Sequence, residues 1–413
     1  MEWNAESRLR LSIPEVSARV SPEVVASTLA RLIGSHAAET QADLVRVTGL
    51  ARTTVAVALD VLEGSGVIQY VGSRPTPGRG RPADRLGLNP SFGLVLVADL
   101  GAHAGRLTVH DLGQDLLAAR DIRLAVSDGP MPVLALITRE FRSMLAEVPA
   151  SVRPLVFVVG LPGPMDTRRG MPVKPPIMNG WDAFPVSDTM GAEFGCPVLL
   201  ENDVNLRALG EARALPPDQS PLLYVKVSTG IGGGLITASG KLHHGADGAA
   251  GDIGHVRVPD ADDSLCACGN YGCVEAVASA SAILRQLKQF RSDPPADLDG
   301  LTALLRAGDS ETVGLVRTAA SRLGEVVANL VHFFNPARIV VGGSLAVASD
   351  DVLAGVRAVV YRRALPLATR NLVISQSVLD QASGTAGGLV LGIEAALTVE
   401  ALSRSMPVAP HRR

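Results

Sequence analysis

Residues 222–237 read LLYVKVSTGIGGGLIT, and residues 94–109 read LVLVADLGAHAGRLTV. Each segment predicts a strand, a polar turn with glycine and a second strand, so each predicts a hairpin. Backbone N–H groups in such a turn can bind an anion. The candidate phosphate-binding positions in the two hairpins are Asp99, Gly101, Thr229, Gly230 and Gly232. The repetition fits two related lobes facing a cleft, although glycine hairpins also occur in unrelated folds.

Strands alternate with helical patterns from about residue 92 to the end of the chain. Strand-like runs follow the first hairpin at PLVFVVGLPGP (154–164), PVLLEND (197–203) and ARIVVGGSL (337–345), and a long helical pattern spans about residues 311–334. This alternation predicts an α/β fold.

The N-terminal region has a different pattern. Residues 1–20 show no clear periodicity and predict a flexible arm. Ser21 and Pro22 suit the N-cap and first position of a helix, and apolar residues then recur at helical spacing. A second helix is predicted near residue 41 and a third over residues 52–63, with Gly49 suited to the turn between them. A strand at residues 67–71 and a loop rich in Gly, Pro and Arg complete a region of residues 21–90.

Three short helices followed by a strand and a basic loop are typical of a winged helix-turn-helix. The third helix would present Arg52, Thr53 and Thr54 to the major groove of double-stranded DNA, where arginine can bind guanine and threonine offers a hydroxyl and a methyl group. Arg79 and Arg81 lie in GRGRP, a basic arm suited to the minor groove or to phosphates. The alternative is a three-helix packing module with a solvated linker.

Three of the four cysteines fall within eight residues, and a histidine precedes them. The spacing is His-x10-Cys-x-Cys-x4-Cys, formed by His255, Cys266, Cys268 and Cys273. Three thiolates and one imidazole complete the tetrahedral shell of a structural zinc and leave no position for a catalytic water. The alternative is three buried thiols beside an unrelated histidine.

The strand PVLL is followed directly by Glu201, Asn202 and Asp203. Polar residues at the carboxyl end of a strand in an α/β sheet lie where ligands bind. Asp203 could act as a general base toward a sugar hydroxyl, with Asn202 orienting a neighbouring hydroxyl. Asn and Asp also cap helices well, so an N-cap is the alternative.

The composition excludes several classes of protein. With 413 residues the chain is long enough for two to three domains. The net charge is 38 − 41 = −3, so any nucleic-acid binding is a property of one segment rather than of the whole surface. No apolar run is long enough to span a membrane and the start does not look like a signal peptide, which predicts a cytoplasmic protein without membrane contact. Cys196 stands apart from the other cysteines and predicts a small core residue.

Several motifs together resemble the ROK family of repressors, open reading frames and kinases. They are GLPGPMD (160–166), STGIGGGLI (228–236), GADGAAGDIGHV (245–256) and CACGNYGCVEAVAS (266–279), joined by the END-x-N run and by the N-terminal helix-turn-helix with GRGRP. The resemblance covers nearly the whole chain from about residue 21. It implies a two-lobed, actin-like and hexokinase-like domain after the winged helix-turn-helix. The first lobe would span residues 92–200 and 384–402, the last helix returning to it, and the second lobe with the zinc loop would span residues 201–383.

The resemblance also implies roles for single residues. Asn202 and Asp203 match the sugar-binding Asn and the catalytic-type Asp, and Glu275 matches the glutamate after the last cysteine. Asp252 and His255 match a Glu-x-Gly-His pair whose histidine also binds zinc. These five residues are the candidate effector-binding set.

Departures from the family pattern bear on activity. Kinases of the family carry Asp-x-Gly-Gly-Thr in the first hairpin, whereas here Asp99-Leu100-Gly101 is followed by Ala102 and His103. Asp252 replaces a glutamate, and Ile177 stands where many members have a polar Asn. The resemblance therefore implies a non-enzymatic, effector-responsive DNA-binding regulator, most often a repressor of carbohydrate genes that forms a homodimer or homotetramer.

Two other classes of function stay open from the sequence. One is an ATP-dependent sugar kinase, and the other is a scaffold that binds a protein through the two lobes. The sequence does not reveal the operator, the effector, or whether the effector releases or promotes DNA binding.

Overall fold

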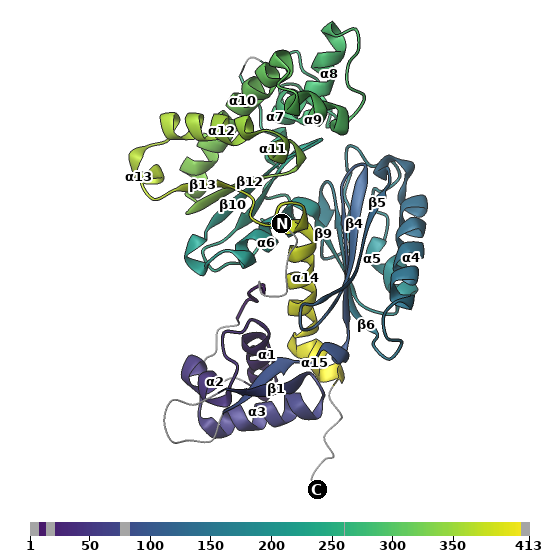
Figure 1. Ribbon diagram of the computed structural model, residues 1–413, viewed down its shortest axis with the longest axis vertical. Helices are drawn as coiled ribbons and strands as arrows, with labels where there is room; N and C mark the ends of the chain where they lie inside the picture. The colour runs from purple at the N-terminus through teal and green to yellow at the C-terminus, as the bar shows by residue number, and fades with distance from the viewer. Residues whose placement is uncertain (1–7, 14–20, 75–82, 260, 406–413) are drawn as a thin grey trace.

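The computed structural model describes residues 8–13, 21–74, 83–259 and 261–405. An N-terminal module lies at one end of the molecule, and two lobes, each built on a sheet, lie side by side beyond it (Figure 1). Within the described ranges, no helix is long and apolar enough to cross a bilayer.

The N-terminal module consists of three helices and a two-stranded sheet. They are α1 (Pro22–Gly34), α2 (Gln41–Thr48), α3 (Arg52–Gly64), β1 (Ile68–Arg74) and its antiparallel partner β2 (Ala83–Leu88). Four apolar residues of α1 recur at helical spacing and are all buried, namely Val25, Leu29, Leu32 and Ile33. Gly49 ends α2 with φ +67°, a conformation that glycine adopts without strain. The three predicted helices and the following strand are therefore confirmed.

Residues 8–13 correct the prediction that residues 1–20 form a flexible arm. Leu9 and Leu11 are buried in the core that joins the N-terminal module to the lobes. The Leu9 amide donates to Gln114 (2.8 Å), and the Arg10 guanidinium donates to the carbonyl of Ala212 at 2.6 Å. Two leucines in these six residues give no period, so their burial comes from tertiary contacts that local sequence does not encode.

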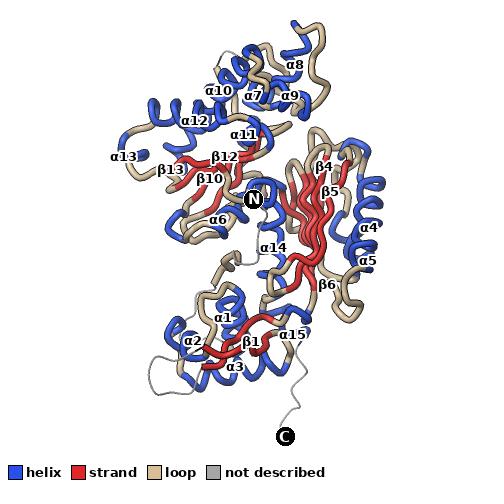
Figure 2. The backbone as a smooth tube through the Cα atoms, viewed as in Figure 1, coloured by secondary structure: helices blue, strands red, loops and turns tan. Residues whose placement is uncertain are grey.

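The first lobe contains a five-stranded sheet in the order β5-β4-β3-β6-β9. Figure 2 draws this sheet in red, with β4, β5 and β6 labelled. Its strands are β3 (Leu94–Leu100), β4 (Ala104–Asp111), β5 (Leu116–Arg123), β6 (Pro154–Leu161) and β9 (Val198–Asn202). Every residue of β3 is buried, because Leu94 and Leu96 face one apolar core while Val95 and Val97 face another. The helices of this lobe are α4 (Pro130–Ala146) and α5 (Val186–Phe194), and a small hairpin forms from β7 (Met165–Asp166) and β8 (Met171–Pro172).

The second lobe contains a four-stranded sheet in the order β11-β10-β12-β13. Its strands are β10 (Leu222–Val227), β11 (Ile231–Ile236), β12 (Arg338–Gly342) and β13 (Val373–Gln376). Only the β10–β11 pair is antiparallel within this sheet. Its helices are α7 (Val274–Ala278), α8 (Ala280–Phe290), α9 (Leu298–Arg306), α10 (Ser310–Phe334), α11 (Ser344–Ala348), α12 (Asp350–Arg363) and α13 (Pro366–Thr369).

Two helices fill the space between the sheets, α6 (Asp203–Ala214) and α14 (Ser383–Ala396). Figure 1 shows α14 running from the lobes toward the N-terminal module. The two helices pack closely because glycine meets backbone at their contact: a Cβ on Gly387 would overlap the carbonyl of Leu206, and one on Gly210 would overlap that of Ser383. α14 also packs against β3 and β6 of the five-stranded sheet.

The chain ends in a separate helix, α15 (Val399–Ser405), which contacts α1. One helix over residues 384–402 was the prediction, and the structure has two. The break falls at Leu397, whose carbonyl accepts a hydrogen bond from Ser27 of α1, so the chain turns where it reaches the N-terminal module.

Candidate functional site

A cleft between the lobes brings together all five predicted effector residues and part of the predicted phosphate-hairpin set. The predicted residues that line it are Asn202, Asp203, Thr229, Gly230, Gly232, Asp252, His255 and Glu275. Asp99 and Gly101 do not line it, although the next residue, Ala102, does. Ile177 lines it with a half-exposed side chain, so this position offers apolar surface rather than a hydrogen bond.

Asn202 serves as the N-cap of α6. Its Oδ1 accepts hydrogen bonds from the amides of Val204 (2.9 Å) and Asn205 (3.2 Å). Its Nδ2 donates to the carbonyl of Gly163 (2.9 Å), which fixes the amide against the loop after β6. The capping interpretation of this residue is therefore confirmed, and a sugar contact at Asn202 stays a prediction.

Asp203 is held by a cation from the second lobe. Its carboxylate is 2 % exposed, and Oδ2 accepts a hydrogen bond from Nζ of Lys226, in β10. The ion pair crosses from the first turn of α6 to the neighbouring sheet. The residue that could serve as a general base is therefore already paired within the protein.

Asp99 is held in the same way by a cation from α6. Oδ2 of Asp99 accepts a hydrogen bond from Arg207 at 2.7 Å, and the carboxylate is 2 % exposed. Burial alone would lower the pKa of the Arg207 guanidinium, but attraction to Asp99 outweighs it and the pKa of Arg207 is raised. Arg207 also donates to Ser383 of α14 (3.3 Å).

The turn of the second hairpin packs against the loop that carries the cysteines. Oε2 of Glu275 accepts a hydrogen bond from the amide of Ile231 (2.9 Å). A Cβ on Gly230 would lie 2.6 Å from that oxygen, so a larger residue there would make the Glu275 carboxylate shift. A Cβ on Gly232 would lie 2.9 Å from Val204 of α6, which gives this glycine a packing role. Phosphate binding by the turn stays a prediction.

Glu201, the residue before Asn202, makes hydrogen bonds with the start of α6. Oε1 of Glu201 accepts from the amide of Asn202 and from Nδ2 of Asn205, both at 2.9 Å. Its other oxygen lies 2.7 Å from Nε2 of His244. The hydrogen bond to Glu201 raises the pKa of His244.

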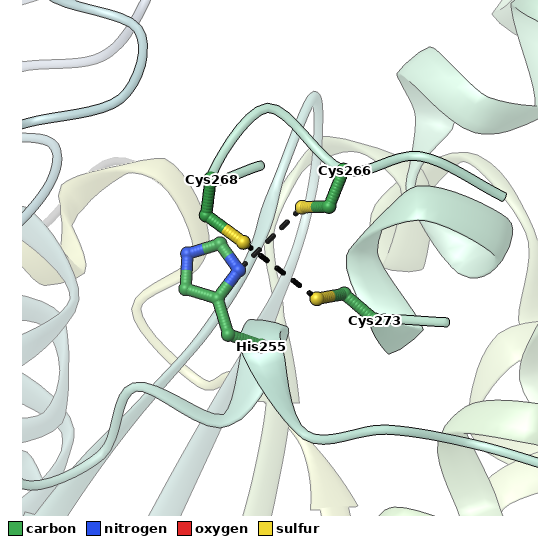
Figure 3. A group of neighbouring side chains, drawn as sticks. All are labelled: His255, Cys266, Cys268 and Cys273. Carbon is green, nitrogen blue, oxygen red and sulfur yellow. Dashed lines mark hydrogen bonds between the residues drawn. The ribbon is translucent and has the colours of Figure 1, made fainter. Parts of the chain in front are cut away.

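His255 and the three cysteines form a candidate metal centre. Figure 3 shows their side chains pointing to a common centre. Sγ of Cys268 and Sγ of Cys273 are 3.7 Å apart, Sγ of Cys266 lies 3.5 Å from Nδ1 of His255, and the four ligand atoms lie within 4.8 Å of one another. In a tetrahedron with Zn–S bonds of about 2.3 Å, the sulfur atoms are about 3.8 Å apart. The donor set and its dimensions therefore fit a four-coordinate metal.

The predicted DNA-contacting residues of α3 share one surface. Arg52, Thr53 and Thr54 form the first turn of the helix and are all exposed. The opposite side of the helix is buried through Val55 and Leu62. Arg79 and Arg81 lie outside the described residues.

Sequence reasoning missed Lys226, Arg207 and His244. Lys226 had a detectable signal, because it is the one charged residue in the apolar strand run LLYVKV. Arg207 had a weaker one, since it follows Asp203 by one helical turn. Nothing in the sequence marks His244.

Comparisons with known proteins agree with this architecture. Residues 96–395 match the family described as the ROK family. The chain is 28 % identical over 348 residues to a putative xylose repressor of Caldicellulosiruptor sp., covering 81 % of this chain and 86 % of the relative. It is 32 % identical over 244 residues to a glucokinase of Halalkalibacterium halodurans, covering 56 % of this chain and 73 % of the relative.

Among solved structures, the chain resembles a ROK family transcriptional regulator described as a homologue of the E. coli MLC protein. The TM-score is 0.76 at 23 % identity, covering 93 % of this chain and 98 % of that one. This likeness establishes the fold, with helices before the two lobes that are consistent with a helix-turn-helix. The match over residues 96–395 spans most of the chain, which is therefore a member of the ROK family.

Proposed function

We propose that the protein is a DNA-binding transcriptional regulator that represses carbohydrate-related genes and binds a sugar or sugar derivative in the cleft. The observation that carries the proposal is that the aspartates of the first hairpin and of the first turn of α6 are each paired with a cation of the protein. Asp99 is bound to Arg207, and Asp203 is bound to Lys226. A cleft arranged in this way suits binding better than phosphate transfer.

The case against a kinase is chemical. Phosphoryl transfer depends on positioned cations at the phosphates and on a group that orients the attacking hydroxyl. Here the Asp99 carboxylate is buried against a guanidinium, and the first hairpin has Ala102 and His103 where the kinases carry Gly and Thr. Glu275 already occupies an amide of the second hairpin.

The relatives support the regulatory function without deciding it. The relative from Caldicellulosiruptor sp. is named a putative xylose repressor and is matched over 86 % of its length. The match to the glucokinase covers 56 % of this chain, against 81 % for the match to the repressor. The exposed first turn of α3 adds the surface that a repressor needs.

The metal is proposed to be a structural zinc. His255, Cys266, Cys268 and Cys273 would hold it, and as a closed Cys3His site it would order the loop without supplying catalysis. Cys273 caps α7, whose first turn carries Glu275, so the loop positions the cleft residue that binds the second hairpin.

The proposal also includes assembly and location. We expect a homodimer or homotetramer, because one arginine on the exposed turn of α3 gives little DNA affinity for a single copy. Light scattering on the full-length protein measures this directly. A protein that regulates genes through an operator acts in the cytoplasm.

Operator selection from fragmented genomic DNA of the source organism tests the function. Wild type is expected to enrich discrete double-stranded sites, and Arg52→Ala, Thr53→Ala and Thr54→Ala are expected to relax the selected sequence by about 1–3 kcal/mol per lost base contact. Arg139→Ala, at an exposed arginine of α4, is the matched control and should leave selection unchanged. Enrichment of no sequence above background would contradict the proposal.

The arm predicted at Arg79 and Arg81 has its own readout. Replacing both with alanine should weaken binding to operator and to random DNA to a similar degree. The slope of log affinity against log salt should fall by about one unit for each lost phosphate contact. An unchanged slope would exclude the arm from the interface.

A coupled ATP assay tests the competing kinase function on the same preparation. We expect no ATP-dependent phosphorylation of any sugar. An effector should instead change operator affinity by about 5- to 150-fold, and Asp203→Asn should remove that response while leaving ligand-free operator binding intact. Efficient sugar phosphorylation by wild type would replace the regulator with a sugar kinase.

A further inference from the structure

Lys226 occupies an unusual place for a lysine. In β10, residues 222, 224 and 226 share one face, and Leu222 and Tyr224 on that face are completely buried against the core between the lobes. Lys226 continues this row at the end of the strand, where it lines the cleft. A charged residue at the end of an apolar row is retained only where it has a partner or a ligand.

The side chain has more hydrogen-bonding capacity than its protein partner uses. An ammonium group has three donors, and Asp203 is the one acceptor that Lys226 has among the described residues. The lysine side chain is 15 % exposed, so its spare donors face a confined space rather than bulk water. Both members of the pair line the cleft, which leaves them accessible to a bound molecule.

A hydroxyl group matches the pair in both roles. It can donate its proton to the Asp203 carboxylate and accept a hydrogen bond from the Lys226 ammonium at the same oxygen. A deoxy carbon satisfies neither group, and an anion satisfies the ammonium but is repelled by the carboxylate. The pair is therefore suited to one kind of substituent.

The remaining charges of the cleft disfavour an anionic ligand. Three carboxylates line the cleft, those of Asp203, Asp252 and Glu275, whereas Lys226 contributes the single ammonium group. The amide of Ile231, which could otherwise bind a phosphate, is taken by Glu275. A phosphate ester would thus meet three carboxylates and lose an expected donor.

We propose that Lys226 is a specificity-determining residue of the cleft, which together with Asp203 recognises one unphosphorylated hydroxyl of a neutral sugar and excludes the phosphorylated form. This inference rests on the proposed function, because it assumes that the cleft binds a sugar. It adds that the ligand is an unphosphorylated sugar, and that Asp203 accepts a hydrogen bond from the same hydroxyl to which Lys226 donates one.

Calorimetry on the full-length, metal-loaded protein tests the inference. The first probes are D-xylose, D-glucose, D-mannose and N-acetyl-D-glucosamine. The second are the 6-phosphates of the last three sugars. The third are the monodeoxy derivatives of whichever free sugar binds. The variants are Lys226→Met, which removes the charge, and Lys226→Arg, which keeps it. Lys241→Met, at an exposed lysine outside the cleft, is the matched control.

Wild type should bind a free sugar, should lose about 10- to 100-fold in affinity when one particular hydroxyl is absent, and should bind the phosphates more weakly still. In Lys226→Met the penalty for that one deoxy position should shrink about tenfold while the penalties at other positions stay the same. A merely structural role for Lys226 would lower all affinities together and leave these ratios unchanged, which would overturn the inference. If Lys226→Met does not fold, the same affinity penalties at each deoxy position are measured on Lys226→Arg.

Two further outcomes separate this inference from the proposed function. Tighter binding of a sugar phosphate than of its free sugar would overturn the role of Lys226 and leave a sugar-responsive regulator in place. Binding of none of the sugars, together with operator binding that none of them changes, would overturn both.

Discussion

The two hairpins start from similar sequences and end in different environments. The strands β3 and β4 meet at a turn closed by a hydrogen bond from the Gly101 amide to the Ala104 carbonyl (2.8 Å), and the acidic residue before the turn is buried. The strands β10 and β11 meet at a turn that lines the cleft, and Lys226, the last residue but one of β10, lines it as well. The acidic residue of the first hairpin is therefore buried against Arg207, whereas the corresponding end of β10 lines the cleft.

The difference comes from partners supplied by other elements. Arg207 of α6 holds the first hairpin through Asp99, and Glu275 of α7 holds the second through the Ile231 amide. A hairpin sequence therefore indicates a possible anion site, but the residues that reach it from elsewhere decide whether the site is open.

The largest difference between the two hairpins is expected when the cation that pairs with Asp99 is removed. Arg207→Met leaves the Asp99 carboxylate buried without a partner, which should lower the free energy of unfolding by about 3–5 kcal/mol. Urea denaturation measures the loss. Arg106→Met is the control, because its pair with Asp121 on the same sheet is exposed and should contribute less than about 1 kcal/mol. Equal losses in the two variants would contradict a structural role for the Arg207 pair.

Loss of the metal should affect only the second hairpin. Cys268→Ser should reduce zinc from about one ion per chain to none and should free Glu275, so that amides of residues 228–234 exchange with solvent faster while those of residues 100–104 do not change. Elemental analysis and hydrogen exchange measure the two effects. Cys196→Ser, at a buried cysteine outside the cluster, should keep the zinc. Protein prepared without chelator that contains no metal would refute the zinc site.

The smallest expected effect is the pH dependence of stability that comes from His244. The hydrogen bond to Glu201 raises the pKa of His244, so the interaction contributes fully to stability below about pH 6.5, the ordinary histidine value, and is lost as the pH rises through the higher folded-state value. His244→Gln should therefore be less stable than wild type at pH 5.5 and similar at pH 9. The side chain is 36 % exposed, which keeps the difference under about 1 kcal/mol.

Thermal unfolding across this pH range measures the effect. His243→Gln, at the exposed neighbouring histidine, is the control and should follow wild type throughout. A His244→Gln deficit that grows with pH would reverse the sign and rule out the Glu201 interaction as its cause.

The sequence predicted what depends on local pattern. Helical spacing placed α1 and α3, and apolar runs placed β3, β6 and β10, because each element buries a periodic or continuous apolar face. The cysteine spacing predicted which four side chains would converge, since a short loop with few residues between ligands limits where they can lie.

Long-range pairing was beyond the sequence. Asp99 and Arg207 are 108 residues apart, and no local pattern links them. Leu9 and Leu11 are buried by elements far along the chain, so a segment without periodicity proved to be ordered. Asn202 shows the remaining ambiguity, because the geometry that caps a helix also places its side chain at a cleft.

The contacts of the N-terminal module bear on how easily that module could be exchanged during evolution. The Arg31 guanidinium donates to the carbonyl of Glu394 (2.7 Å), the Ser27 hydroxyl donates to the carbonyl of Leu397 (2.5 Å), and α1 contacts α15. The module is thus fastened to the last helices of the chain as well as to the segment before α1. A recombination event that transplanted residues 21–88 alone would separate surfaces that fit each other. Inheritance of a new operator specificity should therefore proceed by substitutions on α3, or by joint transfer of both ends of the gene.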